Sequence, residues 1–399
     1  MRSRIALVLA AALLGTCGCV ITPYRVSVRG DGVMAMPGGI IYDPRTETVR
    51  VLRAPGGEDI KIYSMEWSPD GKKLLVLDEA PPKEKRQPLD FGSGSVAELR
   101  MCDENGQNWK LLHTGGSAPD IAHWHPDGKR VTFWTSEGDI NSLDLETGKI
   151  NTELEHASPF YAWQPAGERL AAFQGSDVTT TPPFALTLVT ASGGQELERR
   201  AFTLTAFWPW VSWSRDGKRI LFCAPVATVS SPVVGKEATD DLVKKLSQPS
   251  LFSLVLETGQ AARLTDRHIV YAEESPDGKH ILFVEMVDAQ KTRVGVMNPD
   301  GTGARVLDDG LSFDEKSGTG DPTEAALNAL LCQPVWLSNT RVQYYGGTPP
   351  DVSDVRDTKG MWAIDIDGKN KEDLGAKIGK LIEALPKEDR KQPGEAAPQ

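Results

Sequence analysis

A six-residue motif that recurs along the chain constrains its fold more than any other feature of the sequence. Pro presets the backbone for the first central position of a type I turn, Asp suits the second, and Gly takes the left-handed position that follows. Each copy therefore predicts a tight turn between two antiparallel strands. The copies are Trp67-Ser-Pro-Asp-Gly-Lys, Trp124-His-Pro-Asp-Gly-Lys, Trp163-Gln-Pro-Ala-Gly-Glu, Trp213-Ser-Arg-Asp-Gly-Lys, Glu274-Ser-Pro-Asp-Gly-Lys and the degraded Trp336-Leu-Ser-Asn-Thr-Arg.

Short β-rich runs follow these turns, as at Leu74–Leu77 and Ile281–Val284. A second hairpin comes after most of them, with Thr-Gly or Asp-Gly in its turn, as in residues 140–148 and 361–368. Two hairpins make a four-stranded unit. Such units repeated around an axis are the blades of a β-propeller, an arrangement that leaves only short strand edges exposed.

The motif and its flanking strands resemble the TolB-like, or PD40, class of WD40-like repeats over roughly residues 60–375. The resemblance implies an all-β, TolB-like β-propeller with short helical insertions. TolB itself carries a further α/β domain ahead of its propeller, and here only residues 20–66 separate the leader from the first motif. The resemblance therefore concerns the fold and does not extend to the role of TolB.

The number of blades follows from the number of motif copies. Six copies give six explicit blades, and the β-rich segment at residues 24–52 supplies four further strands. We favour seven blades, with six as the alternative. Spacing between copies reaches 62 residues (274 to 336), beyond the roughly 40 to 45 of a plain repeat, so several blades carry insertions. Helices are predicted at 239–246, 322–331 and 374–385.

The first residues have the character of a secretory leader. A basic start at Met1–Arg4 precedes an apolar run at Ile5–Leu14, which is too short to span a bilayer. The residues that follow resemble a bacterial lipobox, and we favour lipidation of Cys19, with Cys17 as the alternative. The predicted organisation is a lipoprotein signal peptide at 1–19, a β-propeller at 20–375, and a short helix with a disordered tail at 376–399. This places the protein in the bacterial cell envelope, lipid-anchored to a membrane, with the propeller in the periplasm or at the cell surface.

Charge and cysteine content limit the possible partners. The formal net charge is −11 and the chain has no basic run beyond its leader, which argues against nucleic acid as a partner. Cys102, Cys223 and Cys332 form an odd set on or beside different predicted strands, so we expect buried free thiols.

A search for chemistry yields few candidates. His123 and His125 lack a third or fourth ligand, and the chain has neither a Gly-x-Ser-x-Gly elbow nor an EF-hand loop. We therefore predict no catalytic residues, no metal and no cofactor.

Two groups of side chains are candidates for binding. The residue before the motif Trp is Glu66, His123 or Glu273 in three copies, and if these strands are innermost the three side chains approach the central channel around a polar ligand or an ion. Aromatic residues that precede motif strands are the second group, because exposed rings there would stack on sugars or grip a peptide; the alternative is that these rings pack between blades. They are Trp208, Trp210, Phe160 and Tyr161.

These features favour a non-enzymatic envelope lipoprotein, membrane-anchored by its lipid, whose propeller binds an envelope protein, peptide or glycan. The alternative is an envelope hydrolase or lyase that uses polar groups in the propeller channel.

Overall fold

The computed structural model describes residues 25–53, 55, 61–80, 96–114, 119–135, 138–174, 185–190, 196–201, 210–225, 249–288, 290–312, 332–348 and 357–386. The predicted helices at 239–246 and 322–331, the leader with Cys17 and Cys19, Trp208, and the tail after residue 386 lie outside these ranges.

The described strands form seven four-stranded antiparallel sheets, numbered here as blades 1 to 7 in chain order. Blade 1 contains β1 (Ser27–Val28), β2 (Met34–Met36), β3 (Ile40–Asp43) and β4 (Thr48–Val51), with the 3-10 helix η1 (Pro37–Gly39) between β2 and β3. Blade 2 contains β5 (Lys61–Trp67), β6 (Lys73–Ala80), β7 (Val96–Asp103) and β8 (Lys110–Thr114). Blade 3 contains β9 (Pro119–Trp124), β10 (Arg130–Thr135), β11 (Ile140–Asp144) and β12 (Ile150–Leu154).

Blade 4 contains β13 (Ala157–Trp163), β14 (Arg169–Gln174), β15 (Ala185–Thr190) and β16 (Glu196–Ala201). Blade 5 contains β17 (Val211–Trp213), β18 (Arg219–Pro225), β19 (Pro249–Val255) and β20 (Gln260–Arg263). Blade 6 contains β21 (Ile269–Glu274), β22 (Ile281–Asp288), β23 (Lys291–Met297) and β24 (Arg305–Ser312). Blade 7 contains β25 (Val335–Ser338), β26 (Arg341–Tyr345), β27 (Met361–Asp365) and β28 (Glu372–Asp373), and α5 (Leu374–Ala384) follows it.

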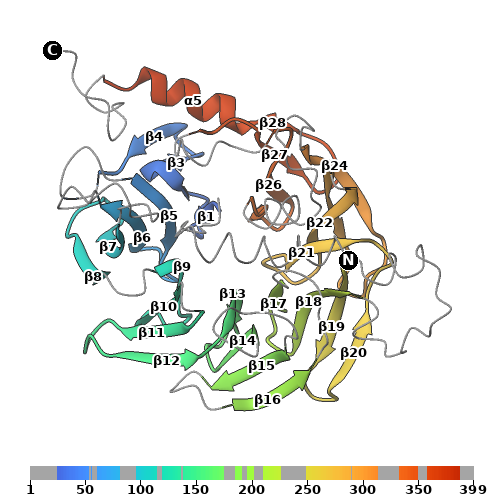
Figure 1. Ribbon diagram of the computed structural model, residues 1–399. Helices are drawn as coiled ribbons and strands as arrows, with labels where there is room; N and C mark the ends of the chain where they lie inside the picture. Colours follow the sequence, from blue (N-terminus) through green and yellow to red (C-terminus); the bar gives the residue numbers. More distant parts are fainter. Residues whose placement is uncertain are drawn as a thin grey trace, which may run out of the picture.

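The sheets stand around a common axis as a β-propeller (Figure 1). In each sheet the first strand lies nearest the axis and the fourth lies at the rim, so the residue before each motif Trp belongs to an innermost strand. The all-β propeller prediction is confirmed, and the count of seven sheets agrees with the favoured number of blades.

The motif turns have the predicted geometry. Gly71, Gly128, Gly217 and Gly278 all adopt φ between 66° and 69°, in the left-handed region that glycine occupies without strain. The Ser68 hydroxyl donates to Asp70 at 2.7 Å, and the same carboxylate accepts the Lys72 amide at 3.1 Å. The motif Asp and Ser are therefore used within the turn itself.

Four of the five motif Trp residues donate an indole hydrogen bond to the preceding blade, and Trp67 is the exception among the described residues. Trp124 Nε1 donates to the backbone carbonyl of Glu66 at 3.0 Å, and Trp213 Nε1 donates to that of Ala162 at 2.9 Å. In each case the acceptor belongs to the residue before the motif Trp of the preceding blade. This bond fixes the relative height of neighbouring innermost strands, because an unpaired indole N–H is costly in a buried seam.

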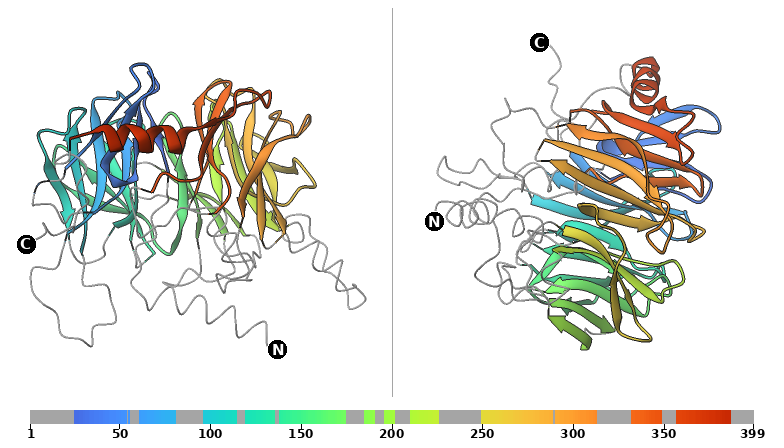
Figure 2. Two further views of the ribbon diagram at one scale, coloured as in Figure 1. Left: turned by 90° about the horizontal axis from the view of Figure 1, so that it is seen from above. Right: turned by 90° about the vertical axis from the view of Figure 1, so that its right-hand side faces the viewer.

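Blades 7 and 1 meet without a strand shared between them, because each sheet is built from consecutive strands. Their seam is an apolar cluster that includes Met36 and Tyr42 of blade 1, Tyr345 of blade 7, and Leu374 and Ile378 of α5. The helix observed as α5 corresponds to the one predicted at 374–385, and it lies against the outside of the ring at this seam (Figures 1 and 2). Helix packing thus contributes to closing the ring.

The three cysteines of the propeller are buried free thiols, as predicted. Burial raises the pKa of the Cys102 and Cys332 thiols to about 12, so neither thiol is ionised near neutral pH. Among the helices that the structure describes, none is long and apolar enough to cross a membrane.

Candidate active site at the ring axis

Two of the three predicted channel residues meet at the axis. Glu66 near the end of β5 and His123 near the end of β9 belong to neighbouring blades, and Glu66 Oε2 lies 2.8 Å from His123 Nδ1. The Trp124 indole, one residue beyond His123, bonds the Glu66 carbonyl and so holds the two strands in this register. The pairing of these side chains is thus a direct product of the repeat. We call Glu66 and His123 the dyad.

The dyad determines which ring nitrogen of His123 carries a proton. An ionised carboxylate only accepts hydrogen bonds, so Nδ1 must be the protonated nitrogen in neutral His123. Nε2 then keeps its lone pair, and it has no hydrogen-bond partner among the described residues. The imidazole also contacts the edge of Tyr161, with ring centroids 5.3 Å apart. A carboxylate-oriented imidazole with a free Nε2 is suited to accept a proton from a bound molecule.

Glu273 at the end of β21, the third predicted residue, lies outside direct contact with the dyad and pairs with cations. Its carboxylate lies 3.6 Å from a guanidinium nitrogen of Arg25 and 3.3 Å from one of Arg215. The Tyr271 hydroxyl lies 2.8 Å from Glu273 Oε2 and 3.0 Å from the Pro334 carbonyl, to either of which it donates. Glu273 therefore anchors two arginines at the axis.

Arg25 links the two halves of the site. Burial alone would lower the pKa of its guanidinium, but the negative charges of Glu273 and Glu66 raise that pKa above its ordinary value. The Arg25 side chain is 35% exposed. Arg25 makes no hydrogen bond to another described residue, and its guanidinium carries five N–H donors.

The axial side chains reach solvent without being fully exposed. The exposed fractions are 32% for Glu66, 25% for His123 and 42% for Arg215. With neutral His123, two guanidinium and two carboxylate charges balance at the axis, so the site tolerates one further negative charge better than two. Charges in such a partly dehydrated place interact more strongly than at an open surface.

A metal does not fit this set of donors. The described residues contain no group of three His, Cys, Asp or Glu side chains arranged to hold a metal ion. Glu66 already accepts from His123, and Glu273 faces two guanidinium groups, which would repel a cation. The suggestion that Glu66, His123 and Glu273 together surround an ion is therefore not supported by their arrangement.

The predicted aromatic surface is wrong for the three members that the structure describes. Phe160, Tyr161 and Trp210 are 4%, 6% and 8% exposed, because they pack between blades instead of facing outward. Trp210 packs against Tyr271 with the two rings tilted at 44° and their centroids 4.5 Å apart, and it donates its indole N–H to the Ala272 carbonyl. Tyr161 instead packs against the His123 ring of the dyad.

Arg25, Tyr271 and Arg215 were missed by the sequence reasoning. Arg25 lies in blade 1, which has no copy of the motif, and Arg215 replaces the motif Pro. The second departure was visible in the sequence and was a usable signal, since a charged residue in a turn position is rarely needed for the turn itself.

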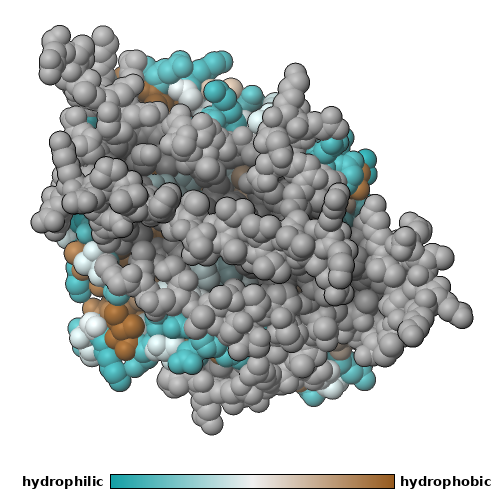
Figure 3. Space-filling view, viewed as in Figure 1, coloured by the Kyte–Doolittle hydropathy of each residue, from teal (hydrophilic) through white to brown (hydrophobic). Residues whose placement is uncertain are grey.

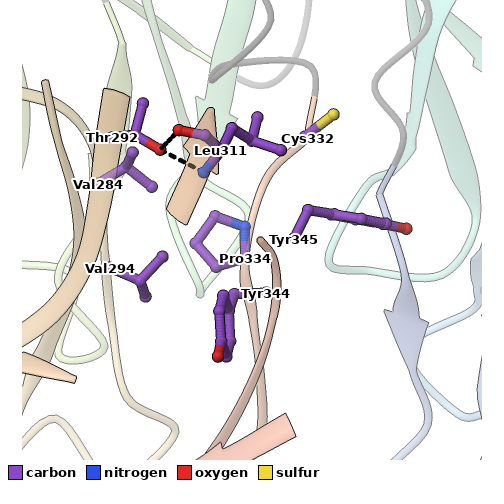
Figure 4. Close-up of a pocket in the computed structure, with 8 residues that line it drawn as sticks. All are labelled: Val284, Thr292, Val294, Leu311, Cys332, Pro334, Tyr344 and Tyr345. Carbon is purple, nitrogen blue, oxygen red and sulfur yellow. Dashed lines mark hydrogen bonds between the residues drawn. The ribbon is translucent and has the colours of Figure 1, made fainter. Parts of the chain in front are cut away.

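A pocket elsewhere in the ring has a different character. It lies between blades 6 and 7, where Val284, Val294 and Tyr344 present mainly apolar surface (Figure 4). Its Thr292 hydroxyl is already occupied by the backbone of Leu311, which donates to it at 2.7 Å. The Cys332 thiol at its edge is buried and protonated. This pocket offers no charged or reactive group to a polar ligand.

The described part of the face seen in Figure 3 is largely hydrophilic, with small separate apolar areas. Large hydrophobic side chains that the described residues expose belong to three different blades, namely Leu111, Ile150 and Val287. They do not form one broad apolar surface for a protein partner.

Comparison with solved structures identifies proteins of the same fold. An oligogalacturonate lyase in complex with manganese is 12% identical, with a TM-score of 0.53 over 88% of this chain and 84% of that chain. The oligogalacturonate lyase from Vibrio parahaemolyticus is 13% identical, with a TM-score of 0.50 over 89% and 85%. TolB from Acinetobacter baumannii is 13% identical, with a TM-score of 0.47 over 87% and 77%. No family model and no curated protein matches the sequence.

At these identities the likeness shows a shared β-propeller fold. It nevertheless corrects one prediction. The prediction that the protein is not an enzyme is corrected, because solved propellers of this fold that cover most of the chain include lyases and the fold therefore does not exclude an enzyme.

Proposed function

We propose that this protein is an enzyme that acts on an acidic glycan at the ring axis, a lyase in preference to a hydrolase. The observation that carries the proposal is the dyad, an imidazole oriented by a carboxylate on neighbouring innermost strands, whose side chain is 25% exposed and whose other nitrogen has no hydrogen-bond partner among the described residues. His123 is the general base, and Glu66 keeps it in the required tautomer and stabilises the imidazolium that forms.

Arg25 supports a substrate that bears a carboxylate. A guanidinium binds a carboxylate with two parallel hydrogen bonds, and Arg25, which hydrogen-bonds to no other described residue, lies within the electrostatic influence of both Glu273 and Glu66 of the dyad. The balanced charge at the axis favours a singly charged group over a doubly charged phosphate, which would face Glu66 and Glu273. Sugar acids of envelope or plant glycans carry such a carboxylate, and the names of the two lyases of the same fold point to the same class.

The same arrangement favours elimination. Pairing of the substrate carboxylate with Arg25 makes the proton on the adjacent carbon more acidic, and His123 Nε2 removes that proton. The electron pair forms a carbon–carbon double bond as the bond to the glycosidic oxygen breaks, and the departing oxygen takes a proton from solvent. Atoms and charge balance without an oxidant or a metal. Hydrolysis would instead need a water molecule held against the anomeric carbon by a pair of carboxyl groups, and each axial carboxylate is already paired.

The cellular place belongs to the same proposal. The basic, apolar and cysteine-bearing leader supports export and lipid attachment at Cys19, or alternatively Cys17, in a bacterial envelope. A glycan is the favoured envelope partner over a protein or peptide, because the exposed large hydrophobic side chains of the described residues are dispersed.

The test is an elimination assay on the purified full-length protein with oligogalacturonate as probe. The new double bond is conjugated to the carboxylate, so product formation is followed by its ultraviolet absorbance. We expect turnover by the natural protein, a loss of about 100-fold or more in His123→Ala, and full activity in His280→Ala. His280 is a matched control, because it lies in a motif turn away from the dyad. Reducing-end formation without the absorbance would make the protein a hydrolase, and turnover by His123→Ala equal to the natural protein would refute the role of the dyad.

A further inference from the structure

One motif copy departs from the others at its most regular position. Five copies begin with Trp, whereas the copy in blade 6 begins with Glu274. This carboxylate is 2% exposed, in a place where the other blades bury an indole. A charged group is buried at this depth only with strong partners, so the exchange needs an explanation beyond the turn.

The direction of hydrogen bonding across this seam is reversed. At four other seams the Trp of the later blade donates to the earlier blade, as Trp124 and Trp213 do, whereas the Trp67 indole has no hydrogen-bond partner among the described residues. Between blades 5 and 6 the earlier blade donates and the later blade accepts. The Arg215 backbone amide donates to Glu274 Oε2 at 2.9 Å, and the Arg219 guanidinium donates to Oε1 at 2.7 Å. Both carboxylate oxygens are therefore held by blade 5.

These bonds decide where the Arg215 side chain goes. With its backbone held against Glu274, the guanidinium runs along blade 6, where it donates to the Ser275 carbonyl at 3.3 Å and to the Glu274 carbonyl at 3.2 Å. Its end reaches Glu273 Oε1 at 3.3 Å. Three contacts with consecutive residues of blade 6 thus place one cation at the axis.

We propose that Glu274 is a positioning residue that fixes Arg215 at the axis as a second cation for the anionic substrate, beside Arg25. A Trp at this position would remove both carboxylate acceptors, and with them the bond that holds the Arg215 backbone against blade 6. The single lost Trp is thereby the change that turns a structural seam into part of the site. This inference rests on the proposed function, since a second cation matters only if an anionic ligand binds there.

Because Glu274 is buried, its role in positioning Arg215 can be tested without a loss of folding stability. Desolvation raises the pKa of this carboxyl, Arg215 and Arg219 oppose that rise, and the nearby Asp216 adds to it. Because the net shift is upward, ionised Glu274 makes folding less favourable than a neutral group there would. Glu274→Gln should therefore fold at least as well as the natural protein while it holds Arg215 less firmly.

The experiment compares Glu274→Gln with Glu285→Gln. Glu285 is the matched control, a partly buried carboxylate of the same blade that pairs with Arg267 at 2.7 Å away from the axis. Calorimetric titration with trigalacturonate gives the dissociation constant, and kinetics on oligogalacturonate give KM and kcat. For Glu274→Gln we expect the dissociation constant and KM to rise about tenfold, as for loss of a charge-assisted hydrogen bond, with kcat little changed. Glu285→Gln should leave both constants as in the natural protein.

A second readout does not depend on the ligand. The side-chain Nε–H signal of Arg215 in a nitrogen-15 NMR spectrum, assigned with Arg215→Lys, reports whether the guanidinium is held. It should shift and exchange faster with water in Glu274→Gln and remain unchanged in Glu285→Gln. An unchanged Arg215 signal overturns the positioning role, and so does an unchanged dissociation constant in a protein that binds trigalacturonate. If the natural protein neither binds nor turns over the probe while the Arg215 signal behaves as expected, the proposed function fails and the structural role of Glu274 stands.

Discussion

The seam between blades 2 and 3 and the seam between blades 5 and 6 use the same repeat position for different purposes. In the first, Trp124 donates to the Glu66 carbonyl, and the bond brings Glu66 and His123 together. In the second, Glu274 accepts from Arg215 and Arg219, and the bonds bring a cation to the axis. In the proposed function, one seam supplies a proton acceptor and the other supplies positive charge.

The contrast teaches how a repeat acquires a site. At the seam between blades 2 and 3 the motif Trp only positions the neighbouring strands. The side chains with chemical character there, Glu66 and His123, occupy the variable position before the motif Trp. At the seam between blades 5 and 6 the residue that joins the two blades is itself different, because Glu274 replaces the motif Trp. A third seam, between blades 7 and 1, has neither device, because Val28 occupies the Trp position and α5 covers the joint instead. Changes at the three seams should therefore have separable effects.

The largest effect is expected at the seam between blades 7 and 1, where α5 takes the place of a motif residue. Ile378 of α5 is fully buried against blades 1 and 7, so Ile378→Ala should lower the free energy of unfolding by roughly 3 kcal/mol, through lost burial and the cavity left behind. Chemical denaturation measures it. Leu381→Ala is the control, since that residue is only partly buried at the same helix, and it should cost clearly less. Equal losses would mean that α5 does not close the ring in the manner described.

The next effect distinguishes the seam of blades 2 and 3 from the seam of blades 5 and 6, because changes at the first should alter kcat and changes at the second should alter KM. Glu66→Gln removes the charge that orients His123 and should lower kcat on oligogalacturonate about 100-fold with little change in KM. Arg215→Met removes a cation and should raise KM about tenfold with kcat retained. Steady-state kinetics on both variants decides the matter. If both variants changed the same constant, the division of labour between the seams would be wrong.

A smaller effect tests whether Trp seams are equivalent in stability but not in function. Trp124→Phe and Trp213→Phe each remove one indole hydrogen bond, to the Glu66 and Ala162 carbonyls, and each should cost about 1 kcal/mol of unfolding free energy. Activity should fall only in Trp124→Phe, because only that bond supports the dyad. Thermal unfolding and the elimination assay are run on the same preparations. Equal activity in the two variants would show that the dyad does not depend on its seam.

The smallest expected effect is a pH dependence of the free energy of unfolding that comes from Glu274, at the seam between blades 5 and 6. Burial raises the pKa of Glu274 above its ordinary 4.5, so the folded protein binds this proton more tightly than the unfolded chain does. The tighter binding of this proton stabilises the folded protein fully below about pH 4.5, and this stabilisation is lost as the pH rises through the higher pKa that Glu274 has in the folded state. Glu274→Gln should therefore be the more stable protein at neutral pH and should approach the natural protein on acidification. A stability difference that stays constant with pH would contradict this sign.

The sequence was informative wherever the repeat is regular. Pro, Asp and Gly predicted the turns, and alignment of the copies predicted that residues before the Trp lie on innermost strands, which brought Glu66 and His123 into view. Arg25 was not predictable, because it belongs to the blade without a motif and its position follows from ring closure. The aromatic residues were misassigned, because whether Phe160 and Trp210 face solvent depends on packing between blades that no single repeat encodes. Glu274 was visible as a lost Trp, but its role needed the contacts across the seam.

The central claim is that His123, oriented by Glu66, faces a bound acidic glycan through Nε2, and nitrogen-15 NMR of the His123 ring tests it most directly. The account predicts that in the substrate-free protein Nδ1 carries the proton. Addition of trigalacturonate should perturb the Nε2 signal both in the natural protein and in the slowly reacting Glu66→Gln variant. The preference of His123 for the Nδ1–H tautomer should be lost only in that variant. An Nε2–H tautomer in the natural protein, or an Nε2 signal indifferent to saturating trigalacturonate, would contradict it.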